Sequence, residues 1–225
     1  MSLVIAVKSC QAHRPYHQAI RDTWGKKFSH VVFYMGGGPA SAPLQPDEVV
    51  LYCDDDYMSL PHKTRAILHH AQSLEYTHIF LCDNDTFINP HEFSKLDYNY
   101  DYSGHINGLC PIGETTYYED HMGKYPKCHP WASGGIGYFL SRKAGDYLVS
   151  KTPNVWAEDL WVGQEIGAEV QAGRMTEKHL DNFNRCAAWH FARTKKYRMY
   201  NPEMMYRSWK LGNPDLMYEE DRVSR

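Results

Sequence analysis

HIFLCDND, residues 78–85, joins an apolar run to an acidic triplet. The first five residues, His78–Cys82, have the length and apolar character of a buried strand, and the run ends abruptly in Asp83-Asn84-Asp85. Alternate side chains of an extended segment share a face, so both carboxylates can point to one spot while Asn84 points away. This geometry suits a hard divalent cation that bridges carboxylates to phosphates, and an Asx turn that closes a strand is the structural alternative.

Strand-like and helix-like segments alternate on both sides of this run. Leu3–Val7 and Val31–Met35 are apolar runs, His17–Trp24 and Lys63–Leu74 have helical character, and Asn89-Pro90-His91-Glu92 has the composition of a helix start. The alternation predicts a Rossmann-like α/β fold with a mostly parallel central sheet flanked by helices, in which ligands bind at the carboxyl ends of the strands. Because KSCQAHRP follows the first strand, a glycine-rich dinucleotide-binding turn is disfavoured.

Length and charge narrow the possible functions. The chain has 225 residues with 24 Lys+Arg and 27 Asp+Glu, a net charge of −3 that argues against nucleic-acid binding. We expect one domain over residues 1–225 and no membrane span, because no apolar run approaches the roughly 20 residues that a span needs. The cysteines lack a C-x-x-C pattern and are expected to be buried free thiols; they are Cys10, Cys53, Cys82, Cys110, Cys128 and Cys186.

Further residues suited to chemistry lie outside the triplet. Glu158-Asp159 are expected in the first turn of a helix, where acids complement the dipole or where one carboxylate faces a cleft as a general base. Glycines within Ser133–Ser141 mark a close approach of backbone or ligand, or merely weaken a strand. His190 lies in an apolar run that would hold an imidazole rigidly, and one imidazole among oxygens suits Mn²⁺ better than Mg²⁺.

Taken in order, these segments resemble the β-1,3-galactosyltransferase and Fringe-like family of inverting glycosyltransferases. The resemblance covers most of the chain and rests on five ordered blocks. They are AVKS (6–9) with QAIRDTWG (18–25), DYMSLPHKT (56–64), CDNDTFIN (82–89), the glycine-rich residues 125–141, and EDLWVG (158–163).

The resemblance implies a GT-A type fold and transfer of a hexose or N-acetylhexosamine from a UDP-sugar to a glycan hydroxyl, with a β-1,3 linkage. Asp85, with Asp83 and His190, would hold Mn²⁺, and Asp159 would be the base, because single displacement needs a proton acceptor on the face opposite the departing UDP. The other implied contacts are Ser9, Arg21, Lys63, Asp83 and Asn84 to the nucleotide, and Trp131, Gly134, Gly135, Glu158 and Trp161 to the sugars.

Regions and partners follow from the same resemblance. We expect a nucleotide-sugar half over about residues 1–100, an acceptor half over about 101–200, and a C-terminal helix and tail over 201–225. The expected partners are a nucleotide-sugar donor and a glycan or glycoconjugate acceptor, and no oligomeric state is predicted. Tyr117, Tyr118, Trp131, Trp156 and Trp161 flank the expected cleft, where they could stack on a sugar or pack in the core.

The chain also departs from the family pattern. Asn84 replaces the middle acid of the usual triple-Asp block, which is tolerable where that side chain faces away. Asn84-Asp85-Thr86 is the only N-x-S/T sequon, and a glycan there would occupy the expected metal site. We therefore expect a cytoplasmic protein, with the Golgi lumen as the alternative if the chain is a trimmed domain of a membrane-anchored enzyme.

Two rival functions remain open on the sequence. A metal-dependent nucleotidyl- or phosphotransferase would also use Asp83 and Asp85 on phosphates, but it would have less need of Asp159 on a separate element. A catalytically silent sugar- or nucleotide-binding module would keep the acids for structure. Substitution of Asp159 separates the silent module from a glycosyltransferase.

Overall fold

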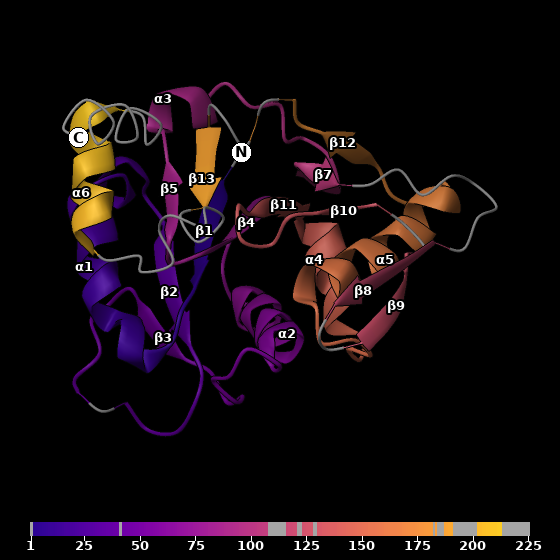
Figure 1. Cartoon of the computed structure of the whole chain (residues 1–225), viewed down its shortest axis with the longest axis horizontal. Coiled ribbons are helices and arrows are strands. Elements are labelled where there is room, and N and C mark those ends of the chain that lie inside the picture. Colours follow the sequence, from indigo (N-terminus) through magenta and orange to yellow (C-terminus); the bar gives the residue numbers. More distant parts are fainter. Residues whose placement is uncertain are drawn as a thin grey trace.

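A seven-stranded, mostly parallel sheet lies at the centre of the computed structural model of the chain (Figure 1). β11 runs antiparallel to both of its neighbours, and the other four pairings are parallel. The predicted fold class is therefore confirmed. Across the sheet the strands are β12 (Glu177–His179), β6 (Tyr102–Gly104), β11 (Tyr138–Ser141), β4 (His78–Asp83), β1 (Leu3–Lys8), β2 (Val31–Met35) and β3 (Glu48–Val50).

The structure describes residues 2–40, 42–107, 116–120, 123–127, 130–181, 183, 187–190 and 202–212. For residues 107, 116–120, 123–127, 189 and 190 it describes the backbone alone.

Helices cover both faces of the sheet (Figure 1). α1 (Arg14–Asp22) and α6 (Pro202–Leu211) pack together on one face, and α2 (Leu60–Ala71), α4 (Arg142–Val149) and α5 (Glu158–Gln171) cover the other. The short helices are α3 (Pro90–Phe93) and the 3₁₀ turns η1 (Gln11–His13) and η2 (Gly25–Lys27).

The residues of β1 show why helices are needed on both sides. Ile5 and Val7 belong to the core under α1 and α6, whereas Val4 and Ala6 belong to the core under α2, α4 and α5. All four are buried, as expected of a parallel strand covered on both faces.

Three small two-stranded sheets flank the main one. β5 (Thr86–Ile88) pairs antiparallel with β13 (Ala188–His190), in a register that places His190 opposite Thr86. β7 (Ile106–Asn107) pairs with β10 (Trp131–Ala132), and β8 (Thr116–Asp120) pairs with β9 (Gly123–Lys127). The first of these pairs extends directly from the acidic triplet.

Helix positions differ from the expected ones by a few residues. The helix expected over His17–Trp24 is α1, which ends at Asp22. It begins earlier than expected, because Pro15 occupies its first turn. The helix expected over Lys63–Leu74 is α2, with Pro61 in its first turn as predicted. The predicted start at Asn89 is confirmed, since its side chain accepts hydrogen bonds from the first two N–H groups after Pro90.

Two composition-based expectations can be compared with the described residues. Cys82 is a buried free thiol as expected, whereas Cys10 and Cys53 are free but partly exposed. No helix of the described residues has the length and apolarity needed to cross a membrane. Both predicted halves contribute strands to the one sheet, and their boundaries stay a prediction. Cys110, Cys128 and Cys186 lie outside the described residues.

The turn before β11 depends on Gly137. Its φ of +108° lies where L side chains are strained, and its N–H donates a hydrogen bond to Ser133 O at 3.0 Å. A Cβ at this position would overlap Phe80 Cζ and lie 2.7 Å from Leu81 O, both on β4. The glycine therefore allows the turn to lie against the strand that carries the acidic triplet.

We predict that Gly137→Ala lowers the free energy of unfolding by about 3 to 4 kcal/mol, since a strained φ and an overlap with β4 add together. Gly173→Ala is the matched control, because Gly173 has a φ of +69° with no heavy atom near the added Cβ. It should lose only about 1 to 2 kcal/mol. Urea unfolding measures both, and equal losses would contradict the packing argument.

Candidate active site

One buried ammonium group joins the chain's two acidic blocks. Lys8 and Asp83 end the neighbouring strands β1 and β4 in the same register. Lys8 Nζ lies 3.3 Å from Asp83 Oδ1 and 3.0 Å from Glu158 Oε2, and it contacts Gly134 O at 3.4 Å. Lys8 is only 4% exposed. Three segments that lie far apart in the sequence therefore meet at one positive charge.

The charge of this ammonium is set by its partners. Burial on its own would lower the pKa of Lys8, but the negative charges of Asp83 and Glu158 outweigh it and raise the pKa above its ordinary value. Lys8 is therefore protonated at any physiological pH. A buried ion pair of this kind is costly to break, because the group that remains keeps its desolvation penalty.

Glu158 lies beneath the site with its carboxylate fully engaged. Only 5% of the residue is exposed. It accepts hydrogen bonds from Lys8 Nζ, from Thr64 Oγ1 at 3.0 Å and from the Tyr138 hydroxyl. The structure thus gives Glu158 a structural role and does not present it to a sugar as the sequence interpretation expected.

Asp159, the predicted base, follows Glu158 in the first turn of α5 and stays partly exposed. Its Oδ2 accepts a hydrogen bond from Gly134 N–H at 3.1 Å, and its Oδ1 accepts one from Leu160 N–H at 2.9 Å. Burial, and next the charge of Glu158, raise the pKa of Asp159 to about 6. A carboxylate of this basicity is mostly ionised at neutral pH and is suited to accept a proton.

The glycine-rich turn connects the two acidic blocks through its backbone. A Cβ on Gly134 would lie 2.6 Å from Glu158 Oε2, so only glycine fits there. Gly135 O accepts a hydrogen bond from Thr86 Oγ1 at 2.6 Å, one residue beyond the triplet. Of the two interpretations of this turn, close approach of the backbone is therefore the one that the structure supports.

In the acidic triplet, the middle residue points into the protein. Asn84 is 8% exposed and donates from Nδ2 to Ser9 Oγ at 3.0 Å, whereas Asp83 and Asp85 are partly exposed. The backbone of His190 lies opposite Thr86, next to the triplet.

These residues supply part of a metal site. Among the described side chains, which do not include that of His190, no three His, Cys, Asp or Glu groups are close enough to hold an ion together. The residue types, two aspartates with one histidine, fit the oxygen-rich, one-imidazole donor set that Mn²⁺ accepts.

Lys63 and Ser9 lie, like the triplet, at the carboxyl ends of the strands. Lys63 Nζ donates to Ser9 O at 2.9 Å and pairs with Asp55. Asp55 in turn accepts hydrogen bonds from Gly36 N–H at 2.9 Å and Gln11 N–H at 3.2 Å. Lys63 is 3% exposed, so its charge ties the loops around the site together.

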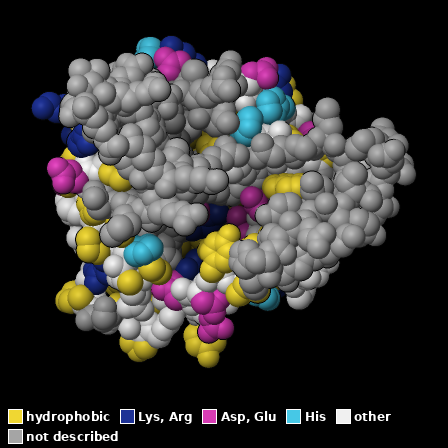
Figure 2. All heavy atoms as spheres, viewed as in Figure 1, with side chains coloured by type: hydrophobic (Ala, Val, Ile, Leu, Met, Phe, Trp, Pro, Cys, Tyr) yellow, Lys and Arg dark blue, Asp and Glu magenta, His cyan; other side chains and the backbone are white. Residues whose placement is uncertain are grey.

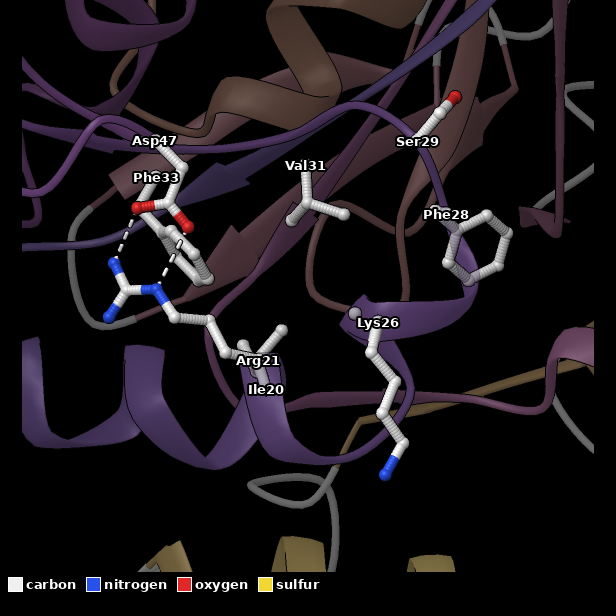
Figure 3. Close-up of a pocket in the computed structure, with 9 residues that line it drawn as sticks. Ile20, Arg21, Lys26, Phe28, Ser29, Val31, Phe33 and Asp47 are labelled. Carbon is white, nitrogen blue, oxygen red and sulfur yellow. Dashed lines mark hydrogen bonds and ion pairs between the residues drawn. The ribbon is translucent and has the colours of Figure 1, made fainter.

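Arg21 is not brought to the triplet. It makes a two-pronged ion pair with Asp47 at 2.6 and 2.8 Å and lines a pocket of about 280 Å³ with apolar side chains that include Phe28 and Val31 (Figure 3). Val31 begins β2, whereas Lys8 and Asp83 end their strands. The pocket therefore lies toward the amino ends of the strands, and Arg21 is not placed to neutralise a diphosphate beside Asp83.

The predicted sugar-contacting aromatics separate into core and surface residues. Trp161 is fully buried, so it cannot stack on a sugar in this conformation. Trp131 is partly exposed and packs on α5, where a Cβ on Gly163 would overlap it. Trp156 contacts Tyr57, with ring centroids 5.4 Å apart. The side chains of Tyr117 and Tyr118 lie outside the described residues.

Sequence reasoning missed Lys8 and Asp55 as parts of the site. Lys8 carries a signal, since it is the charged residue at the end of the apolar segment LVIAVK. Asp55 carries none, because its contacts come from loops that only the fold brings together. The same is true of Thr64 and Tyr138, which bind Glu158.

Comparison with known proteins gives one family and a shared fold. Residues 1–172 match the Fringe-like family, and no curated protein sequence matches the chain. A crystal structure of a glycosyltransferase involved in glycosylation of the major capsid of PBCV-1 has a TM-score of 0.50 at 13% identity, covering 92% of this chain and 100% of that chain. At this identity the likeness shows the fold alone.

Two more structures are similar at lower scores, which carry no argument. The galactosyltransferase LgtC in complex with donor and acceptor sugar analogs has a TM-score of 0.43 at 11% identity, covering 81% of this chain and 74% of that chain. HddC from Yersinia pseudotuberculosis has a TM-score of 0.40 at 11% identity, covering 80% of this chain and 90% of that chain.

We predict that Lys8→Met lowers the free energy of unfolding by about 3 to 5 kcal/mol, because it leaves the Glu158 carboxylate buried without its cation. In Lys8→Met/Glu158→Gln the buried charge is removed as well, so the loss should be smaller than the sum of the single losses. Lys143→Met, at an exposed ion pair, is the control and should lose less than about 1 kcal/mol. Additive losses in a urea-unfolding cycle would show that the two residues are not coupled.

Proposed function

This chain belongs to the Fringe-like family, and we propose that it is an inverting glycosyltransferase. It transfers a hexose or N-acetylhexosamine from a UDP-sugar to a glycan hydroxyl and forms a β-1,3 linkage. The family, together with a fold shared with a known glycosyltransferase, supports the coarser assignment of glycosyltransferase. The residues around Lys8 support the proposed mechanism, in which a base and metal ligands act at one site.

The observation that carries the proposal is the contact of Lys8 with both acidic blocks. One ammonium lies within 3.3 Å of Asp83 and 3.0 Å of Glu158, so the candidate metal ligand and the neighbour of the candidate base occupy one site. A nucleotidyltransferase needs carboxylates at the phosphates, but it has no comparable need for Asp159. Figure 2 shows acidic and basic side chains together in a hollow in the middle of one face.

Asp159 acts as the base in this mechanism. The Gly134 N–H orients its carboxylate, and the raised pKa makes the carboxylate a better proton acceptor than an ordinary aspartate. As the acceptor oxygen bonds to the anomeric carbon, the bond from that carbon to the UDP oxygen breaks. The hydroxyl proton passes to Asp159, and the electron pair leaves with UDP.

Asp83 and Asp85, with His190, are the residues that would hold Mn²⁺. When bound, the ion supplies positive charge that stabilises the departing diphosphate. His190 lies outside the residues that match the family, so its assignment rests on the register of β13 with β5. Lys8 keeps Asp83 beside the glycine-rich turn, which fixes the spacing between the metal ligands and the base.

The proposed acceptor platform is an exposed aromatic surface around Tyr57 and Trp156. Tyr57 is 65% exposed and contacts Trp156, three residues before Asp159. Tyr52 and Met58 are also exposed on the same loop, which Asp55 anchors to Lys63. Aromatic faces that remain in water are suited to stack on the apolar face of a sugar ring.

The proposal is tested with a panel of nucleotide sugars, scored for Mn²⁺-dependent UDP release with and without glycan acceptors. We expect one UDP-sugar to be used. Asp159→Asn should bind Mn²⁺ and UDP as the wild type does and lose transfer by about 10²-fold or more, whereas Asp85→Ala should weaken binding and transfer together.

Two results would contradict this assignment. Unchanged turnover in Asp159→Asn would remove the mechanism, and binding without release of UDP from any donor would favour a silent binding module. Release of diphosphate from a nucleoside triphosphate would instead favour a nucleotidyltransferase.

Tyr57→Ala should raise the KM for the glycan acceptor about fivefold, the equivalent of about 1 kcal/mol of stacking, and leave UDP-sugar hydrolysis unchanged. Tyr206→Ala is the matched control, because Tyr206 is an exposed tyrosine on α6. Steady-state kinetics at varied acceptor concentration separates the two. An equal rise in the KM of both variants, or none in Tyr57→Ala, would place the acceptor elsewhere.

A further inference from the structure

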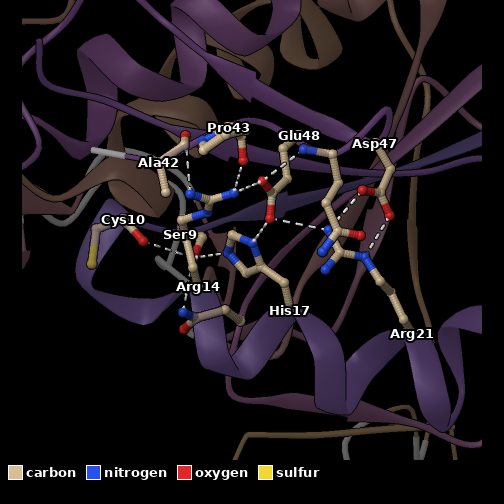
Figure 4. A network of polar contacts seen from close by, with 11 residues as sticks. Ser9, Cys10, Arg14, His17, Arg21, Ala42, Pro43, Asp47 and Glu48 are labelled. Carbon is tan, nitrogen blue, oxygen red and sulfur yellow. Dashed lines mark hydrogen bonds and ion pairs between the residues drawn. The ribbon is translucent and has the colours of Figure 1, made fainter. Parts of the chain in front are cut away.

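A chain of buried polar contacts runs from α1 to the middle residue of the acidic triplet, and Figure 4 shows the part between Glu48, His17 and Ser9. His17 is fully buried on α1, and its ring stacks on Phe33 at 4.3 Å. His17 Nδ1 lies 2.8 Å from Glu48 Oε1, and its Nε2 lies 2.7 Å from Ser9 Oγ. Ser9 Oγ also accepts the hydrogen bond from Asn84 Nδ2. The contacts therefore link four residues that no single sequence block contains.

Glu48 determines that Nδ1 of His17 carries a hydrogen. Burial would raise the pKa of Glu48, but hydrogen bonds from His17, Arg14, the Gln45 N–H and Arg21 outweigh it and lower the pKa to about 2. The ionised carboxylate can only accept hydrogen bonds. Nδ1 of His17 must therefore carry a hydrogen.

The remaining links follow from the neutral state of His17. Burial lowers the pKa of His17, and Arg21 and Arg14 lower it further, against the raising effect of Glu48. A neutral imidazole has one donor and one acceptor, so Nε2 is the acceptor. Ser9 must then donate its single hydroxyl hydrogen to Nε2, which leaves its oxygen as the acceptor for the Asn84 amide.

We propose that His17 is a positioning residue for the acidic triplet, acting through Ser9 to hold Asn84 in the interior while Asp83 and Asp85 face outward. The proposal rests on the function given above, in which the triplet holds Mn²⁺ and UDP. The hydroxyl hydrogen of Ser9 goes to His17 Nε2 at 2.7 Å, because the alternative acceptor, Cys10 O, is 3.5 Å away. Ser9 therefore acts on the nucleotide site through Asn84, and it does not donate a hydrogen bond to the nucleotide.

The same chain of contacts accounts for asparagine at position 84. A carboxylate there would have no hydrogen to offer Ser9 Oγ, so it would compete with His17 Nε2 for the one hydroxyl hydrogen. One buried acceptor would then lack a partner. Asparagine at 84 and a neutral histidine at 17 are therefore matched.

The proton positions can be measured without any enzymatic activity. In the full chain labelled with ¹⁵N-histidine, the His17 signals, assigned by their loss in His17→Gln, should show Nδ1 protonated and Nε2 unprotonated at neutral pH. An Nε2–H tautomer or an imidazolium would overturn the inference, because either would require the Ser9 hydroxyl to turn away from His17.

Asn84→Asp tests the effect on the metal site. A third acidic group beside the ion would ordinarily tighten cation binding, whereas a disrupted Ser9–Asn84 contact should weaken Mn²⁺ binding in the presence of UDP at least fivefold, measured by electron paramagnetic resonance of free Mn²⁺. Asn89→Asp is the matched control, because Asn89 caps α3, where aspartate serves equally well. Its affinity for Mn²⁺ should not change.

The outcomes separate this inference from the proposed function. If the wild type binds Mn²⁺ with UDP and Asn84→Asp binds it equally or more tightly, the role of His17 is overturned and the transferase assignment stands. If the wild type binds neither, the metal site of the proposed function fails, and the role given to His17 fails with it. Weaker binding by Asn84→Asp, together with the Nδ1–H tautomer, supports the inference.

Discussion

The charge on Lys8 is the constraint that organises the candidate site at the carboxyl ends of the strands. Asp83 ends β4 and Glu158 and Asp159 begin α5, and their negative charges would repel one another if nothing lay between them. The Lys8 ammonium contacts the first two and the backbone of Gly134, which in turn orients the third. The last residues of β1 and β4, the glycine-rich turn and the first turn of α5 therefore have to lie at the same place, and this convergence defines the candidate site.

Much of the fold can be predicted from the sequence because its signals are local. Apolar runs identify β1, β2 and β4, and Asn89 indicates the start of α3, because its side chain caps that helix. Helix limits are less certain, since Pro15 and Pro61 mark first turns but do not fix the last residues. The apolar run around His190 indicates β13, whereas the short strand β12 has no such signal, because its pairing depends on a partner distant in sequence.

The site is less predictable, because residue type and order do not reveal depth. Glu158 and Asp159 are adjacent acids, yet one is buried under three donors and the other is partly exposed. Trp161 and Trp131 are equally suited to stack on sugar, but only the second has exposed surface. Arg21 and Lys63 lie on predicted helices, and the direction of each helix face decides that Lys63 contacts Ser9 whereas Arg21 pairs with Asp47.

The burial of Asn84 bears on the one sequon of the chain. An oligosaccharide attached to this nitrogen would have to displace the hydrogen bond to Ser9 and open the interior around it. Glycosylation at this asparagine and completion of the native structure are thus mutually exclusive. In a secretory compartment, the outcome would depend on whether Asn84 is buried against Ser9 before it is glycosylated. Early burial would give the native protein, and early glycosylation would give a modified, misfolded one.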